Sequence, residues 1–301
     1  MRVFDAHVHL VPANPQNYGA SQEVQRGMNF SQLVTEGGPR PYFEEVQRAY
    51  SAASLASCQR FLVLPVAPLS LAGKYPVVNS LNDCFAQMAK ETLGLYTLGA
   101  LALRFEDEVL KEVVKHISEL GLRGIKIHPV FNKLDFNKRA NSIRLFFRFL
   151  SEYGLFAVFH TGPKSVSDQS NCVDVAFLTS LAQEYKVKTV FCHGAGEPWE
   201  IIRAHFINNE YGIIDISDVI AAQEYETNLC EQLFWRLKQS LSMILSDIGP
   251  ERILFGTDFP IASVERSIQG LLDLNLGQNS LDKITWGNAC SLMGISEEET
   301  I

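Results

Sequence analysis

Two histidines separated by a single residue lie in the apolar stretch DAHVHL (5–10), close to the start of the chain. Side chains alternate along a β-strand, so His7 and His9 are expected to share one face, with Asp5 beside them. The alternate residues of this stretch are apolar and are expected to face a layer of helices. Two imidazoles on one buried face are typical of a metal site, because a divalent ion accepts several nitrogen lone pairs at once.

Further residues of metal-ligand type end other short apolar runs of the chain. They are His128, His160, His193 and Asp258. Neutral imidazoles crowded into an apolar interior would leave buried nitrogens unsatisfied, and a divalent cation removes that penalty. The sequence therefore predicts a metal site with four ligands, which are His7, His9, His160 and Asp258.

The chemistry expected of such a site is hydrolysis. A divalent ion lowers the pKa of a bound water to roughly 7. Asp258 is predicted to be catalytic, accepting the proton of that water and passing it to the leaving group. His193 is also predicted to be catalytic, holding the attacking hydroxide by a hydrogen bond or stabilising a developing oxyanion. The bond cleaved would be an amide, lactone or ester.

Two cationic residues belong to the same predicted rim. Arg104 follows the run LYTLGAL (95–101), and Lys126 lies two residues before His128. Together they are expected to bind an anionic substrate, because a guanidinium offers paired donors to a carboxylate. A surface salt bridge is the alternative interpretation of Arg104.

Short β-rich runs that could position these residues recur along the chain, each followed by a segment with helical periodicity. They span residues 2–9, 60–66, 95–101, 123–129, 155–161, 188–194, 211–217 and 253–259. This alternation predicts an α/β fold, a single (β/α)8 TIM barrel over residues 1–301, with the metal site at the carboxyl ends of the strands. An open doubly wound sheet is the alternative, but no glycine-rich nucleotide turn follows the first run. Two long connections, 10–40 and 218–227, are expected to cover the site.

The amino-acid composition limits the classes of molecule that the protein is expected to bind. A formal net charge of −8 argues against a nucleic-acid surface and leaves a small-molecule substrate as the expected partner. The six cysteines lie singly, which is typical of reduced thiols in a cytoplasmic protein. No apolar run is long enough to span a membrane and the N-terminus lacks an apolar signal core, so a cytoplasmic location is predicted.

The ordered motifs resemble the amidohydrolase superfamily, in its amidohydrolase-related branch. The matching pieces are DAHVHL (5–10), GIKIHP (124–129), FHTG (159–162), FCHGAG (191–196), FGTDFP (255–260) and WGNAC (286–290). That branch also contains decarboxylases similar to aminocarboxymuconate semialdehyde decarboxylase. The resemblance covers almost the whole chain.

The resemblance implies a catalytic divalent metal, most often zinc. By position, His7 and His9 match the first-strand ligands, His160 the fifth-strand ligand and Asp258 the eighth-strand carboxylate. His193 matches a histidine that binds a second metal or orients the water.

Several alternatives stay open under this resemblance. Lys126 could be carboxylated and bridge two metals, or could remain an ammonium beside His128; one metal is favoured because Lys126 lies deeper in its strand. Hydrolysis is the first hypothesis, nonoxidative decarboxylation of an aromatic or dienoic acid the second, and a noncatalytic metal-binding barrel the third. A homodimer is plausible by resemblance.

Overall fold

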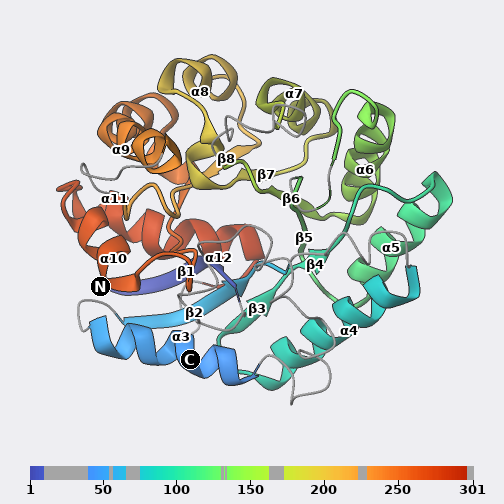
Figure 1. The fold of residues 1–301 in the computed structure, drawn as a ribbon, viewed down its shortest axis with the longest axis horizontal. Helices are drawn as coiled ribbons and strands as arrows, with labels where there is room; N and C mark the ends of the chain where they lie inside the picture. The colour runs from blue at the N-terminus through green and yellow to red at the C-terminus, as the bar shows by residue number, and fades with distance from the viewer. Residues whose placement is uncertain are drawn as a thin grey trace.

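Short parallel strands alternate with helices along the chain and gather into a central ring that the helices surround (Figure 1). The structure is a computed structural model, and it describes residues 1–9, 40–53, 57–65, 75–129, 132, 134–162, 173–222 and 229–296. The strands are β1 (Arg2–Val8), β2 (Ser57–Val63), β3 (Leu95–Thr97), β4 (Gly99–Ala100), β5 (Gly124–Ile127), β6 (Phe156–Phe159), β7 (Thr189–Phe191), β8 (Gly212–Asp215) and β9 (Ile253–Leu254).

The helices follow the strands in alternation. They are α3 (Arg40–Ala53), α4 (Tyr75–Glu91), α5 (Asp107–Glu119), α6 (Ala140–Tyr153), α7 (Val175–Tyr185), α8 (Trp199–Phe206), α9 (Leu229–Ile248), α10 (Val264–Leu272), α11 (Gln278–Asp282) and α12 (Asn288–Met293). Short helical turns are η4 (His193–Gly196), η5 (Pro250–Arg252) and η6 (Lys283–Gly287). In α5 the residues at helical spacing, Leu110, Val113, Val114 and Ile117, are buried, as an amphipathic helix requires.

Parallel pairing runs in the order of the chain. One sheet has the order β1-β2-β3 and the other β4-β5-β6-β7-β8-β9. Only Leu98 separates β3 from β4, so these two short strands occupy one position of the ring. At the other junction, the Ala6 amide donates to the Phe255 carbonyl at 3.0 Å and the His9 amide to the Phe259 carbonyl at 2.8 Å. The predicted (β/α)8 barrel is confirmed.

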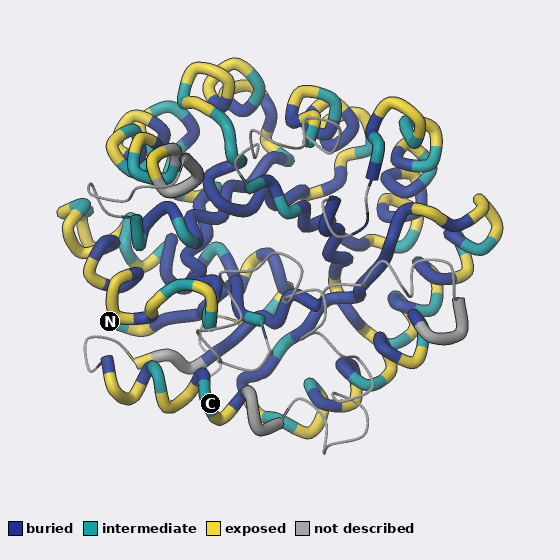
Figure 2. The backbone as a smooth tube through the Cα atoms, in the orientation of Figure 1, coloured by how far each residue is buried: buried dark blue, intermediate teal, exposed yellow. Residues whose placement is uncertain are grey.

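Alternate residues of the strands enter two separate apolar clusters. One cluster takes Leu62, Leu64, Phe156, Val158 and Val190 from three strands. The neighbours of opposite parity, such as Phe61 and Phe159, join the helices in the other cluster. Parallel strands covered on both faces produce this division, and it identifies the first cluster as the barrel interior. Buried residues accordingly line the whole ring (Figure 2).

A β-bulge in β1 corrects one prediction. Asp5 pairs with Phe61 and Val8 with Val63, so the register shifts between Asp5 and Val8. Phe4 and Ala6 belong to the interior cluster, which places Asp5 on the opposite face, where the Tyr50 hydroxyl donates to it at 2.7 Å. Asp5 therefore does not share a face with His7 and His9, because the extra residue inverts the alternation.

Trp286 of η6 closes the amino-terminal end of the barrel interior. Its side chain is 2% exposed and belongs to the interior cluster. The guanidinium carbon of Arg2 lies 4.0 Å from the centre of the indole and that of Arg60 lies 4.7 Å away. The interior is thus filled at the end opposite the predicted site.

The long connections lie mostly outside the described residues. Of the connection 10–40 only Arg40 is described, at the start of α3, and of 218–227 the structure describes 218–222. Cys84, Cys192 and Cys290 are free thiols. None of the helices within the described ranges has the length and apolarity needed to cross a membrane.

Candidate metal centre

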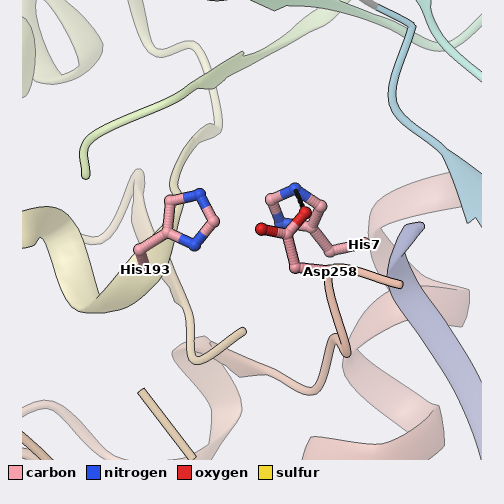
Figure 3. A group of neighbouring side chains, drawn as sticks. All are labelled: His7, His193 and Asp258. Carbon is pink, nitrogen blue, oxygen red and sulfur yellow. Dashed lines mark ion pairs between the residues drawn. The ribbon is translucent and has the colours of Figure 1, made fainter. Parts of the chain in front are cut away.

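The carboxyl ends of the strands bring the predicted residues together from segments far apart in the sequence. His7 is the penultimate residue of β1, Asp258 follows β9, and His193 begins the turn after β7 (Figure 3). One ligand atom from each of these three residues lies within 4.8 Å of the others. Each of these three residues is at most 3% exposed. This is the rim at which TIM barrels build their active sites.

On one side of this group, two imidazoles face one carboxylate oxygen. The Nε2 atoms of His7 and His9 are 3.2 Å apart. Oδ1 of Asp258 lies 3.2 Å from Nε2 of His7 and 3.0 Å from Nε2 of His9. The two first-strand histidines and the eighth-strand aspartate thus form one wall of the centre.

His160 and His193 form the opposite wall. Nδ1 of His160, which follows β6, lies 3.0 Å from Nε2 of His193. The ring of His128 stacks on that of His160, with centroids 3.9 Å apart and an interplanar angle of 13°. The remaining histidines of the chain lie elsewhere, His116 in α5 and His205 in α8.

Left-handed backbone conformations aim several of these side chains. The φ angles are 54° at His193, 60° at Asp218 and 58° at Asp258, a region that residues other than glycine rarely adopt. At Gly196, φ is 62° and an added Cβ would lie 1.7 Å from the Thr161 carbonyl oxygen. The turn after β7 can therefore pass so close to β6 only because residue 196 is glycine.

The Nδ1 atoms of the first wall face oxygen acceptors. Nδ1 of His9 donates to the Leu64 carbonyl at 2.9 Å. Nδ1 of His7 makes a short contact with the Asp215 carboxylate, which lies on β8. A carboxylate or carbonyl can only accept, so the proton of each ring is held at Nδ1. In the neutral form of each ring, the Nε2 atom then presents a lone pair to Asp258.

His193 has the same arrangement. Its Nδ1 lies 3.1 Å from Oγ and 3.4 Å from the carbonyl oxygen of Ser217, and 3.5 Å from Oδ2 of Asp218. The Ser217 carbonyl oxygen can only accept a hydrogen bond, which favours the proton at Nδ1. The Nε2 lone pair of His193 then faces His160.

The pKa shifts of the centre differ from one histidine to the next. Burial lowers the pKa of His193 to about 4 and that of His160 well below its usual value. Burial opposes charge on His7 as well, but the Asp215 and Asp258 carboxylates outweigh it and raise the His7 pKa well above its usual value. Burial opposes ionisation of Asp258, yet His7 and His9 hold its pKa well below the usual range. A positive charge is thus favoured between His7 and Asp258.

The donor set fits a divalent metal. Oδ1 of Asp258 is buried and has no hydrogen-bond partner among the described residues. It faces imidazole nitrogens whose lone pairs point the same way, an arrangement that is repulsive unless a proton or a cation lies between the atoms. Nitrogen and carboxylate ligands of this kind suit Zn²⁺ and other divalent transition metals.

The two predicted cations lie in different environments. Lys126 is 1% exposed, and its Nζ donates to Sγ of Cys192 at 3.0 Å. Burial lowers the pKa of His128 well below its usual value, and the electrostatic effect of Lys126 lowers it further. The side chain of Arg104, by contrast, is exposed in the turn before α5, and none of the contacts that join the centre involves it.

Strand β8 and the turn after it supply three acidic or hydroxyl residues that sequence reasoning missed. They are Asp215, Ser217 and Asp218, and the first two are at most 1% exposed. The signal was present in the run YGIIDIS (211–217), where two polar residues stand at alternate positions of an otherwise apolar strand. Alternate polar residues in a buried strand indicate inward-facing partners.

Comparison with known proteins decides the family. The family model described as amidohydrolase matches residues 4–295. The chain belongs to the amidohydrolase family. This match confirms the resemblance noted in the motifs. Members of the superfamily are enzymes that generally bind a divalent metal.

Solved structures of amidohydrolases share the fold at low sequence identity. The 5-carboxyvanillate decarboxylase from Sphingomonas paucimobilis has a TM-score of 0.66 at 14% identity, covering 98% of this chain and 99% of that one. The 2,6-dihydroxybenzoate decarboxylase from Rhizobium has a TM-score of 0.65 at 15% identity, covering 97% and 98%. A candidate 2-pyrone-4,6-dicarboxylic acid hydrolase from Pseudomonas putida has a TM-score of 0.61 at 15% identity, covering 99% and 98%. Both hydrolases and decarboxylases are therefore built on this barrel.

Proposed function

We propose that this amidohydrolase is a zinc-dependent hydrolase of a small acidic substrate, with one metal ion held by His7, His9, His160 and Asp258. The observation that carries the proposal is the buried Oδ1 of Asp258, which faces two imidazole nitrogens at 3.0 and 3.2 Å and lacks a hydrogen-bond partner among the described residues. Bound zinc would supply Lewis-acid polarisation of a substrate carbonyl and would acidify a water.

The protein's own groups would manage the proton. Asp258 takes the proton of the attacking water at its carboxylate and later delivers it to the leaving group. His193, with its proton at Nδ1 among oxygen acceptors, positions that water by accepting a hydrogen bond at Nε2. This assignment replaces stabilisation of an oxyanion by His193, because a neutral imidazole of this tautomer has no donor at Nε2.

One metal is favoured over two because of the position of Lys126. A carboxylated lysine bridges two metals through its two carbamate oxygens, so the end of its side chain must point at both ions. Here Nζ of Lys126 faces Sγ of Cys192, to which it donates at 3.0 Å. A second cation near Cys192 would also meet the repulsion of this ammonium.

The substrate we propose is a carboxylated ring compound. The structural neighbours are named for 5-carboxyvanillate, 2,6-dihydroxybenzoate and 2-pyrone-4,6-dicarboxylic acid, all acids built on a ring. The charge of Lys126 beneath the centre favours an anionic group there. His128, Arg104 and the connections 10–40 and 218–227 are the proposed determinants of which acid is bound.

Nonoxidative decarboxylation is the second candidate. Two of these neighbours are decarboxylases, and the same centre could protonate a ring carbon while carbon dioxide leaves. In that reaction Asp258 would give its proton to carbon and no solvent oxygen would enter the product.

Metal analysis of the purified protein tests the centre. We expect about one zinc per chain in the wild type and a large loss of zinc in His7→Ala. Two ions per chain would overturn the single-metal assignment, and a zinc-free wild type that fails to bind added Zn²⁺ would overturn the proposed function.

Product analysis then separates the reactions. Carboxylated lactones, N-acyl compounds and aromatic acids would be incubated with the enzyme in ¹⁸O-water. Hydrolysis places ¹⁸O in the product, whereas decarboxylation releases carbon dioxide and leaves the product unlabelled. We also propose that the protein is cytoplasmic and that it acts on small molecules as a homodimer. Sedimentation equilibrium would test the dimer.

A further inference from the structure

We propose that Asp215 and Ser217 are positioning residues that hold the ring protons of His7 and His193 at Nδ1, so that the Nε2 atom of each ring faces the proposed metal centre. This inference rests on the proposed metal-dependent function. Both residues are buried, with exposed fractions of 1% for Asp215 and 0% for Ser217. Asp215 ends β8 and Ser217 lies in the turn two residues later, where both side chains contact Nδ1 of His7.

Asp215 acts on His7. Its Oδ2 accepts from Nδ1 of His7 in a short contact, while its Oδ1 accepts from the Ser217 amide at 2.7 Å. Close packing keeps the carboxylate in place, because a Cβ added at Gly256 would lie 3.1 Å from Oδ1 of Asp215. A carboxylate that orients a ligating histidine in this way also raises the basicity of the ring.

Ser217 joins the two walls of the centre. Its Oγ lies 3.1 Å from Oδ2 of Asp215, 2.9 Å from Nδ1 of His7 and 3.1 Å from Nδ1 of His193. The hydroxyl has one hydrogen, and the carboxylate is the neighbour that can only accept it. The lone pairs of Oγ are then left for the Nδ1–H groups of the two histidines. One hydroxyl thereby sets the proton position in two rings that belong to different strands.

Asp215→Asn tests the first half of this device. An amide has one oxygen, and the Ser217 amide N–H and His7 Nδ1–H both require an acceptor. When the oxygen serves Ser217, the amide NH₂ faces His7 Nδ1 and forces the proton to Nε2, where it blocks metal binding. We expect zinc affinity, measured by chelator competition, to fall about 10- to 100-fold.

A second readout is independent of metal and of activity. A short Nδ1–H to carboxylate hydrogen bond gives a strongly deshielded, slowly exchanging imidazole proton in ¹H–¹⁵N NMR. We expect this resonance in the metal-free wild type, assigned by its absence in His7→Gln, and expect it to disappear in Asp215→Asn. Ser217→Ala should keep the resonance, because His7 retains Asp215 as its acceptor. It should weaken zinc binding, because the hydroxyl no longer holds the Asp215 carboxylate or the Nδ1–H groups of His7 and His193.

Asp5→Asn is the matched control. Asp5 is a buried aspartate on β1 that accepts hydrogen bonds from Tyr50, Thr257 and the His7 amide, and none of its hydrogen bonds within the described ranges involves an imidazole. This variant should lose stability but keep the deshielded resonance. An unchanged resonance with unchanged zinc affinity in Asp215→Asn would overturn the proposal, as would loss of the resonance in Asp5→Asn. A wild type that shows the resonance but binds no zinc would refute the proposed function and leave the positioning role standing.

Discussion

At the scale of single residues, the centre depends on where each proton is held. Three imidazoles have oxygen acceptors at Nδ1, although the acceptor differs in each case. They are His7, His9 and His193. Asp258 supplies the carboxylate that lies beside them. Its backbone is left-handed, with a φ of 58°, and this conformation directs the side chain toward the imidazoles. The side chain of Asp258 is therefore the most sensitive position for chemistry.

Asp258→Asn should separate catalysis from folding. The amide keeps the shape of the side chain but cannot accept a proton, so turnover should fall about 10²- to 10⁴-fold. Steady-state kinetics on the substrate found by screening would measure this, with circular dichroism as the control for folding. Unchanged turnover with metal still bound would support a noncatalytic metal-binding barrel.

Thr257 determines how the segment before Asp258 is held. Its hydroxyl donates to Oδ2 of Asp5 at 2.6 Å and accepts from the Phe259 amide at 3.1 Å, and burial raises the pKa of Asp5 to about 6 in spite of these bonds. Thr257→Val leaves two buried polar groups short of a partner. Unfolding free energy should fall by about 1–3 kcal/mol, measured by denaturant titration of the metal-free protein.

Thr179→Val is the control for that experiment. Thr179 is also buried, but its hydroxyl donates to the carbonyl of Val175 within helix α7. That carbonyl keeps a helical backbone partner after the substitution, so the loss should be clearly smaller. Equal losses in the two variants would contradict a special role for the Asp5–Thr257 contact.

At the scale of elements, the junction of β1 with the segment after β9 determines how the side chains of the proposed metal centre are placed. The bulge in β1 brings His7 and His9 to the inner face, and the Asp258 amide donates to the His7 carbonyl at 2.8 Å. Gly256 allows the close approach, because an added Cβ would lie 2.5 Å from Cβ of His7. The two segments could not lie this close with a side chain at position 256.

Gly256→Ala should therefore push the two elements apart. We expect a loss of about 1–3 kcal/mol in unfolding free energy and weaker zinc binding, measured by denaturant titration and chelator competition. Gly277→Ala is the matched control, since its φ of −62° is ordinary and an added Cβ there meets nothing within 4 Å. A stable, zinc-competent Gly256→Ala would show that the junction can relax.

At the scale of the whole molecule, stability and chemistry occupy opposite ends of the barrel. Trp286 fills the amino-terminal end, 2% exposed, with its ring 6.3 Å from that of Phe4. The proposed metal ligands lie at the carboxyl ends of the strands. Changes at one end are expected to leave the other largely intact.

Trp286→Ala tests this separation. Removing a buried tryptophan should lower the unfolding free energy by about 3–5 kcal/mol, measured by denaturant titration. Zinc stoichiometry below the new unfolding midpoint should stay at the wild-type value. A variant that loses zinc while still folded would contradict the separation of the two ends.

Removal of zinc should lower the stability of the whole fold. Because the proposed zinc ion would bind only the assembled centre, it should stabilise the fold by about 2.7 kcal/mol when free zinc is 100 times Kd. Thermal unfolding of chelator-treated protein, with and without added Zn²⁺, would show this shift. His7→Ala is the control and should show little of it.

The sequence alone determined the strand order, the helices between the strands and the histidines at the carboxyl ends. These follow from local rules, since burial on both faces makes each strand an apolar run and parallel strands end at a common rim. His7, His9, His160, His193 and Asp258 are brought together as that logic requires. Ordered motifs of the same residues also indicated the family.

Only the tertiary structure decided which way each side chain points and what holds it. The face of Asp5 depends on a bulge whose position is set by pairing with β2, so strict alternation predicted it wrongly. The roles of Asp215 and Ser217 depend on contacts with His7, more than two hundred residues away in the chain. Such contacts arise when the ring of strands closes, because closure brings the first and the last strands into register, and no local pattern encodes that register.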